Sequence, residues 1–495
     1  MKQTLVLALD QGTTGTTALL LDRRGEVRGR GYAELPQHFP RPGWVEHDGG
    51  EIWTSVARAV RGALATARAR GGAIAAIGIT NQRETALLWR RDTGRPVARA
   101  IVWQDRRTAE RCAALRRAGL ETDVRRRTGL VLDPYFSATK VEWMLRHHRG
   151  LLAQARRGAL AFGTVDAWLV WKLTGGAVHA TDPTNASRTM LYDIARRRWD
   201  EALLARFGVP PALLPEVRPS SGNFGVTRGA GFLPDGIPIA GVAGDQQAAL
   251  FGQGCVAAGQ SKNTYGTGCF LLLHTGTRRI VSRAGLLTTV ACGPAGEPAY
   301  ALEGSVFIAG AALQWLRDGL GIIGRASESE KLARSVADSG GVVMVPAFVG
   351  LGAPHWRPDV RGAIFGLTRG TTRAHLVRAA LESLAFQSRD LVEAMARDSG
   401  ARVRSLKVDG GAAANDWLMQ YQADLLGVPV ARPRVIETTA LGAGLLAGLA
   451  VGFWKSHRDL DRARRIERVF RPGRTAAWRR REIERWNEAV ERLLG

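Results

Sequence analysis

One polar stretch decides the fold: Asp10-Gln-Gly-Thr-Thr-Gly-Thr-Thr17. It lies between two short apolar runs, Thr4–Leu9 and Ala18–Asp22, and each has the composition of a buried strand. The stretch is therefore predicted to be a turn between two strands. Its glycines let the backbone approach a ligand, and its N–H groups and Thr hydroxyls can donate to phosphate oxygens, while Asp10 can hold a hydrated Mg²⁺. An ordinary Thr-rich hairpin has the same sequence, so the rest of the chain must distinguish the two.

The composition indicates two or more folded domains. The chain has 495 residues, 45% of them hydrophobic and only 20 of them proline. Its formal net charge of +24 first suggests a nucleic-acid partner. The basic residues are, however, spread along the chain, and no compact basic block is interleaved with aromatic residues. Solvated helix faces explain the charge better, and we expect no nucleic-acid partner.

The cysteines and the apolar segments indicate a cytoplasmic protein. Cys112, Cys255, Cys269 and Cys292 show no metal-ligand spacing, which predicts reduced, buried thiols. The first apolar run is too short for a secretory signal, so we expect none. The longest apolar stretch, Ala440–Trp454, is too short and too rich in glycine to span a membrane.

The predicted elements occur in a similar order twice. In the first half the two strands are followed by a strand over Val27–Leu35, a helix to about Arg70 opened by a capping box of Asp48 and Glu51, and a buried strand over Ala73–Thr80. In the second half the order is Gln260–Thr264, the turn Tyr265–Gly268, a strand over Cys269–His274, a helix over about Phe307–Leu320, a strand over Gly341–Ala347, a helix over about Arg373–Asp398 and a strand over Ser405–Asp409. This repetition predicts an α/β fold of two RNase H-like, actin-like ATPase domains, residues 1–254 and 255–495, with a nucleotide cleft between them.

Three polar clusters follow predicted strands. Asn81–Thr85 contains an adjacent Arg and Glu that either grip a polyol or form a surface ion pair. Gly244–Gln247 places Asp245 where a general base or a helix N-cap is expected. Gly410–Asn415 leaves room for a flat base, although a helix that packs against a strand gives the same pattern. No Lys follows a Gly anywhere in the chain, which excludes a P-loop.

The chain resembles the glycerol kinase branch of the FGGY carbohydrate kinase family over nearly its whole length. The stretches that carry the resemblance are Asp10–Thr14, Pro42–Asp48, Gly78–Thr85, Gly163–Asp166, Thr184–Met190, Ala243–Gly252, Asn263–Phe270, Gly362–Arg369 and Asp409–Gly411. Tyr135–His147 and Gly362–Glu382 are similar to the two patterns found across the family. The resemblance implies phosphorylation of glycerol to sn-glycerol 3-phosphate by ATP, with Mg²⁺ as cofactor, and we expect a homo-oligomer, a dimer or tetramer.

The resemblance also implies the site residues. The glycerol pocket is expected to consist of Arg83, Glu84, Trp103, Tyr135, Asp245, Gln246 and Phe270, with Asp245 as the catalytic base. The ATP site is expected to consist of Thr13, Thr14, Gly15 and Thr267 at the phosphates and of Gly310, Gln314, Gly411 and Asn415 at the nucleoside, with Asp10 holding the water shell of Mg²⁺. The alternatives are an FGGY kinase for another small polyol or ketose, or an actin-like ATPase with an assembly or regulatory role. An actin-like ATPase with an assembly or regulatory role requires the nucleotide turns but no polyol-binding cluster, and this chain has both.

The chain departs from the family pattern near the expected pocket. Thr17 stands where relatives usually carry an Arg near the phosphates, and Asp105 replaces a small neutral residue. The segment Arg218–Ala240 differs from the segment in which relatives carry regulatory motifs.

The first departure gives a test. Thr17→Arg should lower the Kd for ATP in calorimetric titration, because a charge-assisted hydrogen bond contributes about 1.5–3 kcal/mol when well formed. Thr17→Gln, which adds length without charge, should not lower it. An unchanged Kd in both variants would show that a cation elsewhere already serves the phosphates.

Overall fold

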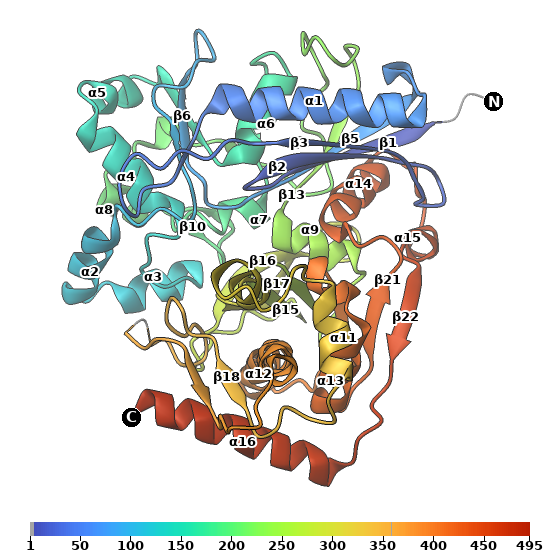
Figure 1. The fold of residues 1–495 in the computed structure, drawn as a ribbon. Coiled ribbons are helices and arrows are strands. Elements are labelled where there is room, and N and C mark those ends of the chain that lie inside the picture. The colour runs from blue at the N-terminus through green and yellow to red at the C-terminus, as the bar shows by residue number, and fades with distance from the viewer. Residues whose placement is uncertain (1–3, 358) are drawn as a thin grey trace.

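The structure, a computed structural model, describes residues 4–357 and 359–495. One main β-sheet is built from the first half of the chain and another from the second half (Figure 1). The first half contains β1 (Leu5–Gln11), β2 (Gly15–Leu21), β3 (Val27–Glu34), β4 (Glu46–His47), α1 (Gly49–Ala67), β5 (Ile74–Asn81), β6 (Leu87–Arg90), β7 (Ala100–Ile101), α2 (Ala109–Arg117), α3 (Glu121–Thr128), α4 (Ser137–His147), α5 (Leu151–Arg156), β8 (Leu160–Gly163), α6 (Val165–Leu173), β9 (Ala180–Thr181), α7 (Pro183–Ala186), β10 (Tyr192–Asp193), β11 (Arg198–Trp199), α8 (Glu201–Phe207), β12 (Glu216–Val217), β13 (Ile239–Gly244) and α9 (Asp245–Gly252).

The second half has a similar number of regular elements. They are β14 (Ser261–Tyr265), β15 (Cys269–Gly276), β16 (Leu287–Cys292), β17 (Pro298–Val306), α10 (Gly310–Gln314), a π-helical turn (Trp315–Gly319), α11 (Glu328–Arg334), β18 (Val343–Val345), β19 (Ala363–Phe365), α12 (Arg373–Ser399), β20 (Leu406–Asp409), a 3₁₀ turn (Gly411–Ala414), α13 (Asp416–Leu426), β21 (Val430–Pro433), α14 (Thr438–Ala450), α15 (His457–Ala463), β22 (Ile466–Phe470) and α16 (Ala476–Leu494).

The two main sheets have the same strand order. The first is β3-β2-β1-β5-β13, and the second contains β17-β15-β14-β20-β21, with β16 and β22 added at its edges. In each sheet the first three strands are antiparallel neighbours and the next two run parallel to the central strand. This repeated order confirms the predicted pair of RNase H-like domains.

Strand β1 is apolar on both faces because helices cover both. Leu5, Leu7 and Leu9 pack with Ile52 and Val56 of α1. Val6 and Ala8 point to the other face, where Leu441 and Leu445 of α14 meet them. Side chains alternate along a strand, so Asp10 continues the row of Val6 and Ala8 and emerges on the α14 face.

Helix α14 carries most of the apolar stretch Ala440–Trp454, and it packs on the sheet of the first half. Its small residues allow this contact: a Cβ at Gly78 of β5 would lie 2.0 Å from the Ala443 carbonyl oxygen, and a Cβ at Gly442 would lie 1.9 Å from that of Ala248. The stretch is therefore a buried helix between sheet and α9. Among the described residues, no helix is both long and apolar enough to cross a membrane.

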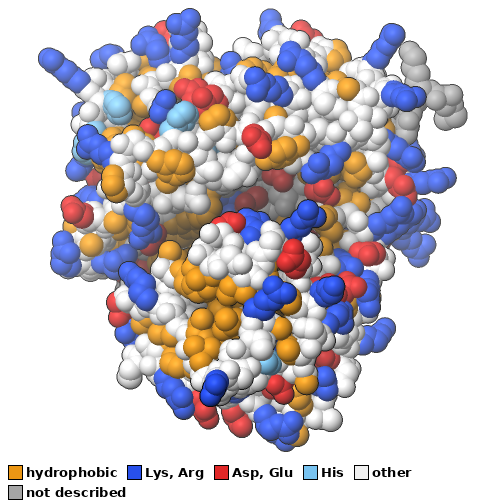
Figure 2. Space-filling model, viewed as in Figure 1, with side chains coloured by type: hydrophobic (Ala, Val, Ile, Leu, Met, Phe, Trp, Pro, Cys, Tyr) orange, Lys and Arg blue, Asp and Glu red, His pale blue; other side chains and the backbone are white. Residues whose placement is uncertain are grey.

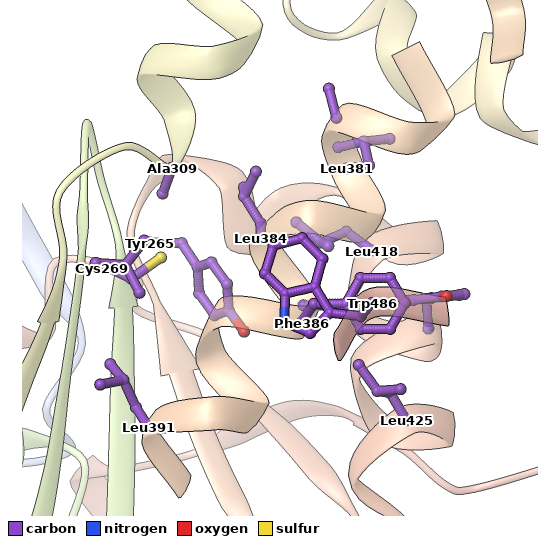
Figure 3. Close-up of a cluster of buried hydrophobic side chains, with 14 of the residues drawn as sticks. Tyr265, Cys269, Ala309, Leu381, Leu384, Phe386, Leu391, Leu418, Leu425 and Trp486 are labelled. Carbon is purple, nitrogen blue, oxygen red and sulfur yellow. The ribbon is translucent and has the colours of Figure 1, made fainter. Parts of the chain in front are cut away.

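The core of the second half lies around the long helix α12 (Figure 3). Leu381 and Leu384 of this helix pack in the same cluster as Tyr265 and Cys269 of the sheet. On its other side Phe386 stacks on Trp486 of α16, with ring centroids 5.1 Å apart. The C-terminal helix thereby closes the core.

Three local expectations differ from the structure. Asp48 does cap α1 through the Gly50 and Glu51 N–H groups, but the Glu51 carboxylate binds His38 Nε2 at 2.8 Å instead of closing the capping box. The helix expected from Phe307 begins only at Gly310 and changes to a π-helical turn at Trp315. The strand expected over Gly341–Ala347 is limited to Val343–Val345, where β19 pairs with it.

A hollow runs between the two halves of the molecule (Figure 2). Turns that follow the central strands β1 and β14 are the two Gly/Thr turns of the sequence, Gly12–Thr14 and Gly266–Gly268.

Candidate active site

The first Gly/Thr turn is tightly closed. The Gly12 N–H donates to the Gly15 carbonyl at 2.9 Å, and a Cβ at Gly15 would lie 2.5 Å from Tyr32 Oη. Trp103 donates its indole N–H to Thr13 Oγ1 at 2.9 Å, while Thr14 is exposed. This hydrogen bond connects Trp103, which is expected at the polyol, with Thr13, which is expected at the phosphates.

Asp10 lies among other acids. Burial, then the charges of Asp245 and Glu437, raises the pKa of the Asp10 carboxyl to about 7. Carboxylates that crowd one region favour a bound cation, because a cation relieves their repulsion. The arrangement fits the expected place of Asp10 beside a divalent ion.

Thr17 faces the same space as Asp10. The two residues are directly paired between β1 and β2, so their side chains share one face of the sheet. Arg30, paired with Leu19 on the next strand, lies on that face as well and binds Glu437 at 3.1 Å (Nε to Oε1). The guanidinium of Arg30 therefore lies near Thr17, on the face where relatives usually carry an Arg.

Asp245 is held at the start of α9. The preceding Gly244 donates its N–H to Thr184 Oγ1 at 2.8 Å, which fixes the end of β13. Oδ1 of Asp245 accepts from the Gln246 N–H at 2.6 Å and lies 3.0 Å from Arg83 Nε. The side chain is 31% exposed, so its carboxylate is open to a small substrate from the hollow.

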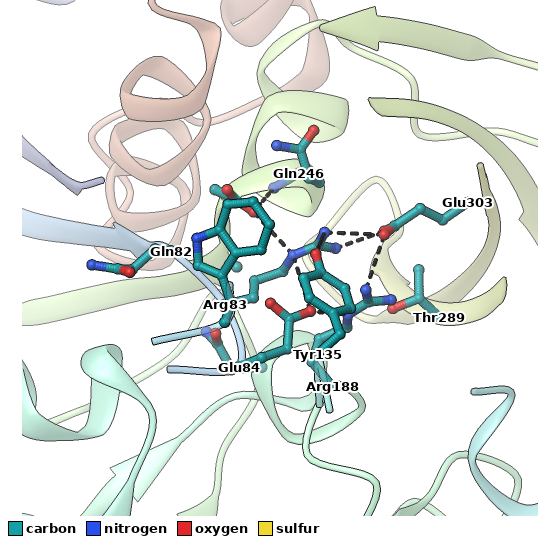
Figure 4. A network of polar contacts seen from close by, with 12 residues as sticks. Gln82, Arg83, Glu84, Tyr135, Arg188, Gln246, Thr289 and Glu303 are labelled. Carbon is teal, nitrogen blue, oxygen red and sulfur yellow. Dashed lines mark hydrogen bonds and ion pairs between the residues drawn. The ribbon is translucent and has the colours of Figure 1, made fainter. Parts of the chain in front are cut away.

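Arg83 and Glu84 follow β5 directly and are both buried (Figure 4). Glu84 adopts φ +61°, an uncommon value for a residue other than glycine, and such strain is typical of functional sites. Its Oε1 accepts from Arg188 Nε at 2.6 Å. The surface ion pair considered as an alternative for this dipeptide is therefore wrong.

Trp103 and Tyr135 form an aromatic wall beside Arg83. Their rings meet edge to face with centroids 5.5 Å apart, and Arg83 Nη2 donates to Tyr135 Oη at 3.4 Å. Burial, followed by the charge of Glu84, raises the pKa of Tyr135 above its ordinary value. The hydroxyl stays protonated at neutral pH and can donate.

Gln246 and Phe270 are brought together by Lys262 of β14. The Lys262 ammonium donates to Gln246 Oε1 at 2.5 Å and to the Phe270 carbonyl at 3.3 Å. Lys262 is fully buried, and burial lowers its pKa below the usual value. This contact fixes a residue of α9 against the hairpin of the other half.

The second Gly/Thr turn packs on the start of α10. Gly310 donates its N–H to the Gly266 carbonyl at 3.0 Å, and Ala311 donates to that of Thr267 at 3.0 Å. A Cβ at Gly410 would lie 2.5 Å from the Tyr265 carbonyl oxygen, which brings the neighbouring, exposed Gly411 to the same turn. Three of the residues expected around ATP, Thr267, Gly310 and Gly411, are therefore neighbours.

The other two residues expected at the nucleoside differ in their surroundings. Gln314 is exposed and lies one helical turn beyond Gly310. Asn415 accepts the Leu418 N–H at 2.9 Å, as an N-cap of α13, and donates to Ser329 Oγ at 3.3 Å. One lone pair and one N–H of the Asn415 amide remain for a ligand.

Asp105, the second departure from the family pattern, is turned away from the pocket. Its buried carboxylate binds the Val45 N–H at 2.7 Å and pairs with Arg107 at 2.8 Å. The acid therefore anchors the segment before α1.

Sequence reasoning missed Arg188, Glu303 and Lys262 as members of this site. Arg188 lies within a stretch that carried the family resemblance, Thr184–Met190. Glu303 and Lys262 are single charges within otherwise buried strands, and a buried charge requires a partner. A single charged residue within an apolar strand was therefore the sequence signal that could have identified Glu303 and Lys262.

Asp10→Asn tests the crowding of acids. The pKa of Asp10 in the folded chain lies above its ordinary value of 3.8, so the ionised carboxylate lowers the stability of the folded state above that pH, increasingly up to about pH 7. The variant removes this cost. Its gain in Tm over the parent should be larger at pH 8 than at pH 5 in calorimetry without nucleotide or divalent ions, and an equal gain at both would contradict the crowding.

Comparison with known proteins identifies the family. Residues 5–252 match the N-terminal domain of the FGGY family of carbohydrate kinases, and residues 261–451 match its C-terminal domain. Glycerol kinase from Myxococcus xanthus is 57% identical over 493 residues, covering 99% of both chains, and that from Bordetella parapertussis is 58% identical, covering 99% of this chain and 97% of the relative. The crystal structure of Plasmodium falciparum glycerol kinase with ADP superposes with a TM-score of 0.93 at 36% identity, covering 100% of this chain and 99% of that one. The chain belongs to the FGGY family of carbohydrate kinases.

Proposed function

We propose that this chain phosphorylates glycerol with ATP, which yields sn-glycerol 3-phosphate and ADP. Full-length similarity to glycerol kinases supports the reaction. The observation that carries the proposal is the 3.0 Å contact between Arg83 Nε and Asp245 Oδ1 at the start of α9. It places the guanidinium of a residue expected at the polyol beside a carboxylate whose side chain is 31% exposed.

Asp245 acts as the general base. Its carboxylate accepts the proton of the terminal hydroxyl while the hydroxyl oxygen forms a bond to the γ-phosphorus and the bond to the ADP oxygen breaks. Arg83, Glu84 and Gln246 bind the other hydroxyls. Trp103, Tyr135 and Phe270 cover the carbon chain, as expected for a small, partly apolar substrate.

The two Gly/Thr turns bind ATP. Thr13, Thr14, Gly15 and Thr267 lie around the phosphates in this proposal, and Gly310, Gln314, Gly411 and Asn415 lie around the nucleoside. The packing of Gly310 and Gly411 on the turn that contains Thr267 supports the grouping. Phosphoryl transfer depends mainly on positioning and charge stabilisation, which many small contacts supply.

Mg²⁺ fits the acids around Asp10. Within residues 4–357 and 359–495, no group of three or more His, Cys, Asp or Glu side chains is arranged to hold a metal ion. Asp10 would therefore hold the ion through its water shell, with the remaining ligands from water and phosphate. Bound there, Mg²⁺ would neutralise phosphate charge during transfer.

We also propose a cytoplasmic location, a homo-oligomeric assembly and a division into two domains. Four free, buried cysteines support a reducing, cytoplasmic location. We expect a homo-oligomer with no nucleic-acid partner. The proposed division into residues 1–254 and 255–495 is supported by α9 ending at Gly252 and β14 beginning at Ser261, although α14 returns to the first sheet.

A coupled ADP-release assay with glycerol, dihydroxyacetone, xylulose and ribulose tests the reaction. Glycerol should give the highest kcat/KM, and ATP turnover should require an added polyol. Preference for a ketopentose would indicate another FGGY activity. Equal turnover without any polyol would indicate an ATPase.

Asp245→Asn should lower kcat for glycerol phosphorylation by about 10²–10⁴, which is the usual contribution of a positioned general base. Binding of ADP should be retained in calorimetric titration. Asp235→Asn, an exposed loop position whose side chain accepts the Gly229 N–H, serves as the control and should keep full turnover. Near-normal turnover of Asp245→Asn would exclude this carboxylate as the base.

A further inference from the structure

The two arginines of the polyol site are held by an acid from the other half of the chain. Glu303 lies in the middle of β17, between Leu302 and Gly304, and its side chain is buried. Oε2 of Glu303 accepts from Arg83 Nη1 at 2.6 Å, and Oε1 accepts from Arg83 Nη2 at 3.0 Å. Oε1 also accepts from Arg188 Nη2 at 3.0 Å (Figure 4). Both carboxylate oxygens therefore accept hydrogen bonds from residues of the first half.

We propose that Glu303 is a positioning residue of the glycerol pocket, which acts from the second half of the chain through Arg83 and Arg188. The inference rests on the proposed assignment of Arg83 and Glu84 to glycerol. Glu303 itself touches no reacting atom in this proposal.

The bidentate contact fixes the plane of the Arg83 guanidinium. Two parallel N–H···O bonds define an orientation that a single bond does not. With Nη1 and Nη2 bound to Glu303, the Nε edge of Arg83 is directed to Asp245 Oδ1 at 3.0 Å. Glu303 thereby determines how Arg83 Nε is oriented towards Asp245, the proposed base.

The second contact reaches Glu84. Arg188 binds Glu303 with Nη2 and Glu84 Oε1 with Nε, the latter at 2.6 Å. Glu84 also holds the strained φ of +61°, so its side chain needs a fixed partner. Two of the polar residues proposed for glycerol are thus oriented by Glu303, Arg83 directly and Glu84 through Arg188.

Charge balance explains why the acid is needed. Arg83, Arg188, Glu84 and Glu303 form a buried set with two positive and two negative charges. Burial alone would raise the pKa of Glu303, but Arg188 and Arg83 lower it to about 2, so the acid stays ionised at any working pH. Without it, the two arginines would face only one buried carboxylate, that of Glu84, and the plane of the Arg83 guanidinium beside Asp245 would no longer be fixed.

The position of Glu303 links the pocket to the arrangement of the halves. Arg83 follows β5 and Arg188 follows α7, both in the first half, whereas β17 belongs to the second sheet. The contact between Lys262 and Gln246 joins the same two halves. The glycerol pocket is therefore complete only while the halves lie together as they do here.

Glu303→Gln tests the proposal by the split between the two KM values. The KM for glycerol should rise about tenfold or more, because the variant leaves the buried donors that Arg83 and Arg188 direct at Glu303 without an ionised acceptor, whereas the KM for ATP should stay within about twofold. A purely structural defect would lower the active fraction, and hence kcat, without this selective change. Glu303→Asp keeps the charge, so its KM for glycerol should rise less than that of Glu303→Gln.

Glu382→Gln is the matched control. Glu382 is a buried acid of the same half that also pairs with two arginines, Arg378 and Arg485, but lies away from the pocket. Both KM values of this variant should equal those of the parent. Phosphorylation of glycerol by the parent and this control tests the proposed function separately from the role of Glu303.

If Glu303→Gln does not fold, as judged by ADP binding, Arg188→Lys takes its place. It keeps the charge but loses the planar fork between Glu303 and Glu84, and it should raise the KM for glycerol selectively. A glycerol KM within twofold of the parent, or an equal rise in both KM values, would overturn the proposal in either variant.

Discussion

The ion pair between Arg83 and Glu303 is the interaction on which the site depends. It joins the end of a strand in the first sheet to the middle of a strand in the second, with nitrogen–oxygen distances of 2.6 and 3.0 Å and both side chains buried. Isolated charges do not persist in such surroundings, so each partner requires the other. Through this pair the proposed general base, the proposed polyol-binding arginine and the second sheet form one unit.

The fold provides the frame for this contact by repeating one sheet order twice. Each central strand, β1 and β14, runs into a Gly/Thr turn, and each sheet carries its helices on its faces. Helix α14 adds a further connection between the halves, because a late segment of the chain covers the sheet that begins it (Figure 1). Its glycines and alanines allow backbone to lie directly on backbone, which explains why an apolar stretch of this composition belongs inside the protein.

Local patterns predicted the parts of the fold that depend on local physics. The apolar runs around residues 10–17 became β1 and β2, and the repeated strand–turn–strand order predicted the paired domains, because a strand covered on both faces must be apolar throughout. Partners that lie far apart in the chain had no such signal. Arg188 and Glu303 are 115 residues apart, and Arg83 and Glu303 are 220 apart, so no spacing rule joins them. Asp105 illustrates the reverse: its position near the pocket was predicted, but its attachment to Arg107 and Val45 depends on a tertiary turn that sequence patterns do not encode.

A crystal structure of the protein with glycerol, ADP and Mg²⁺ would show whether Arg83 and Asp245 bind the polyol while Glu303 holds Arg83. We expect a glycerol hydroxyl within about 2.6–3.2 Å of an Asp245 carboxylate oxygen, the range in which a general base acts. Arg83 should contact the polyol while it remains bidentate on Glu303. Glycerol bound elsewhere, or bound at Asp245 with Arg83 released from Glu303, would contradict the proposed arrangement of the pocket.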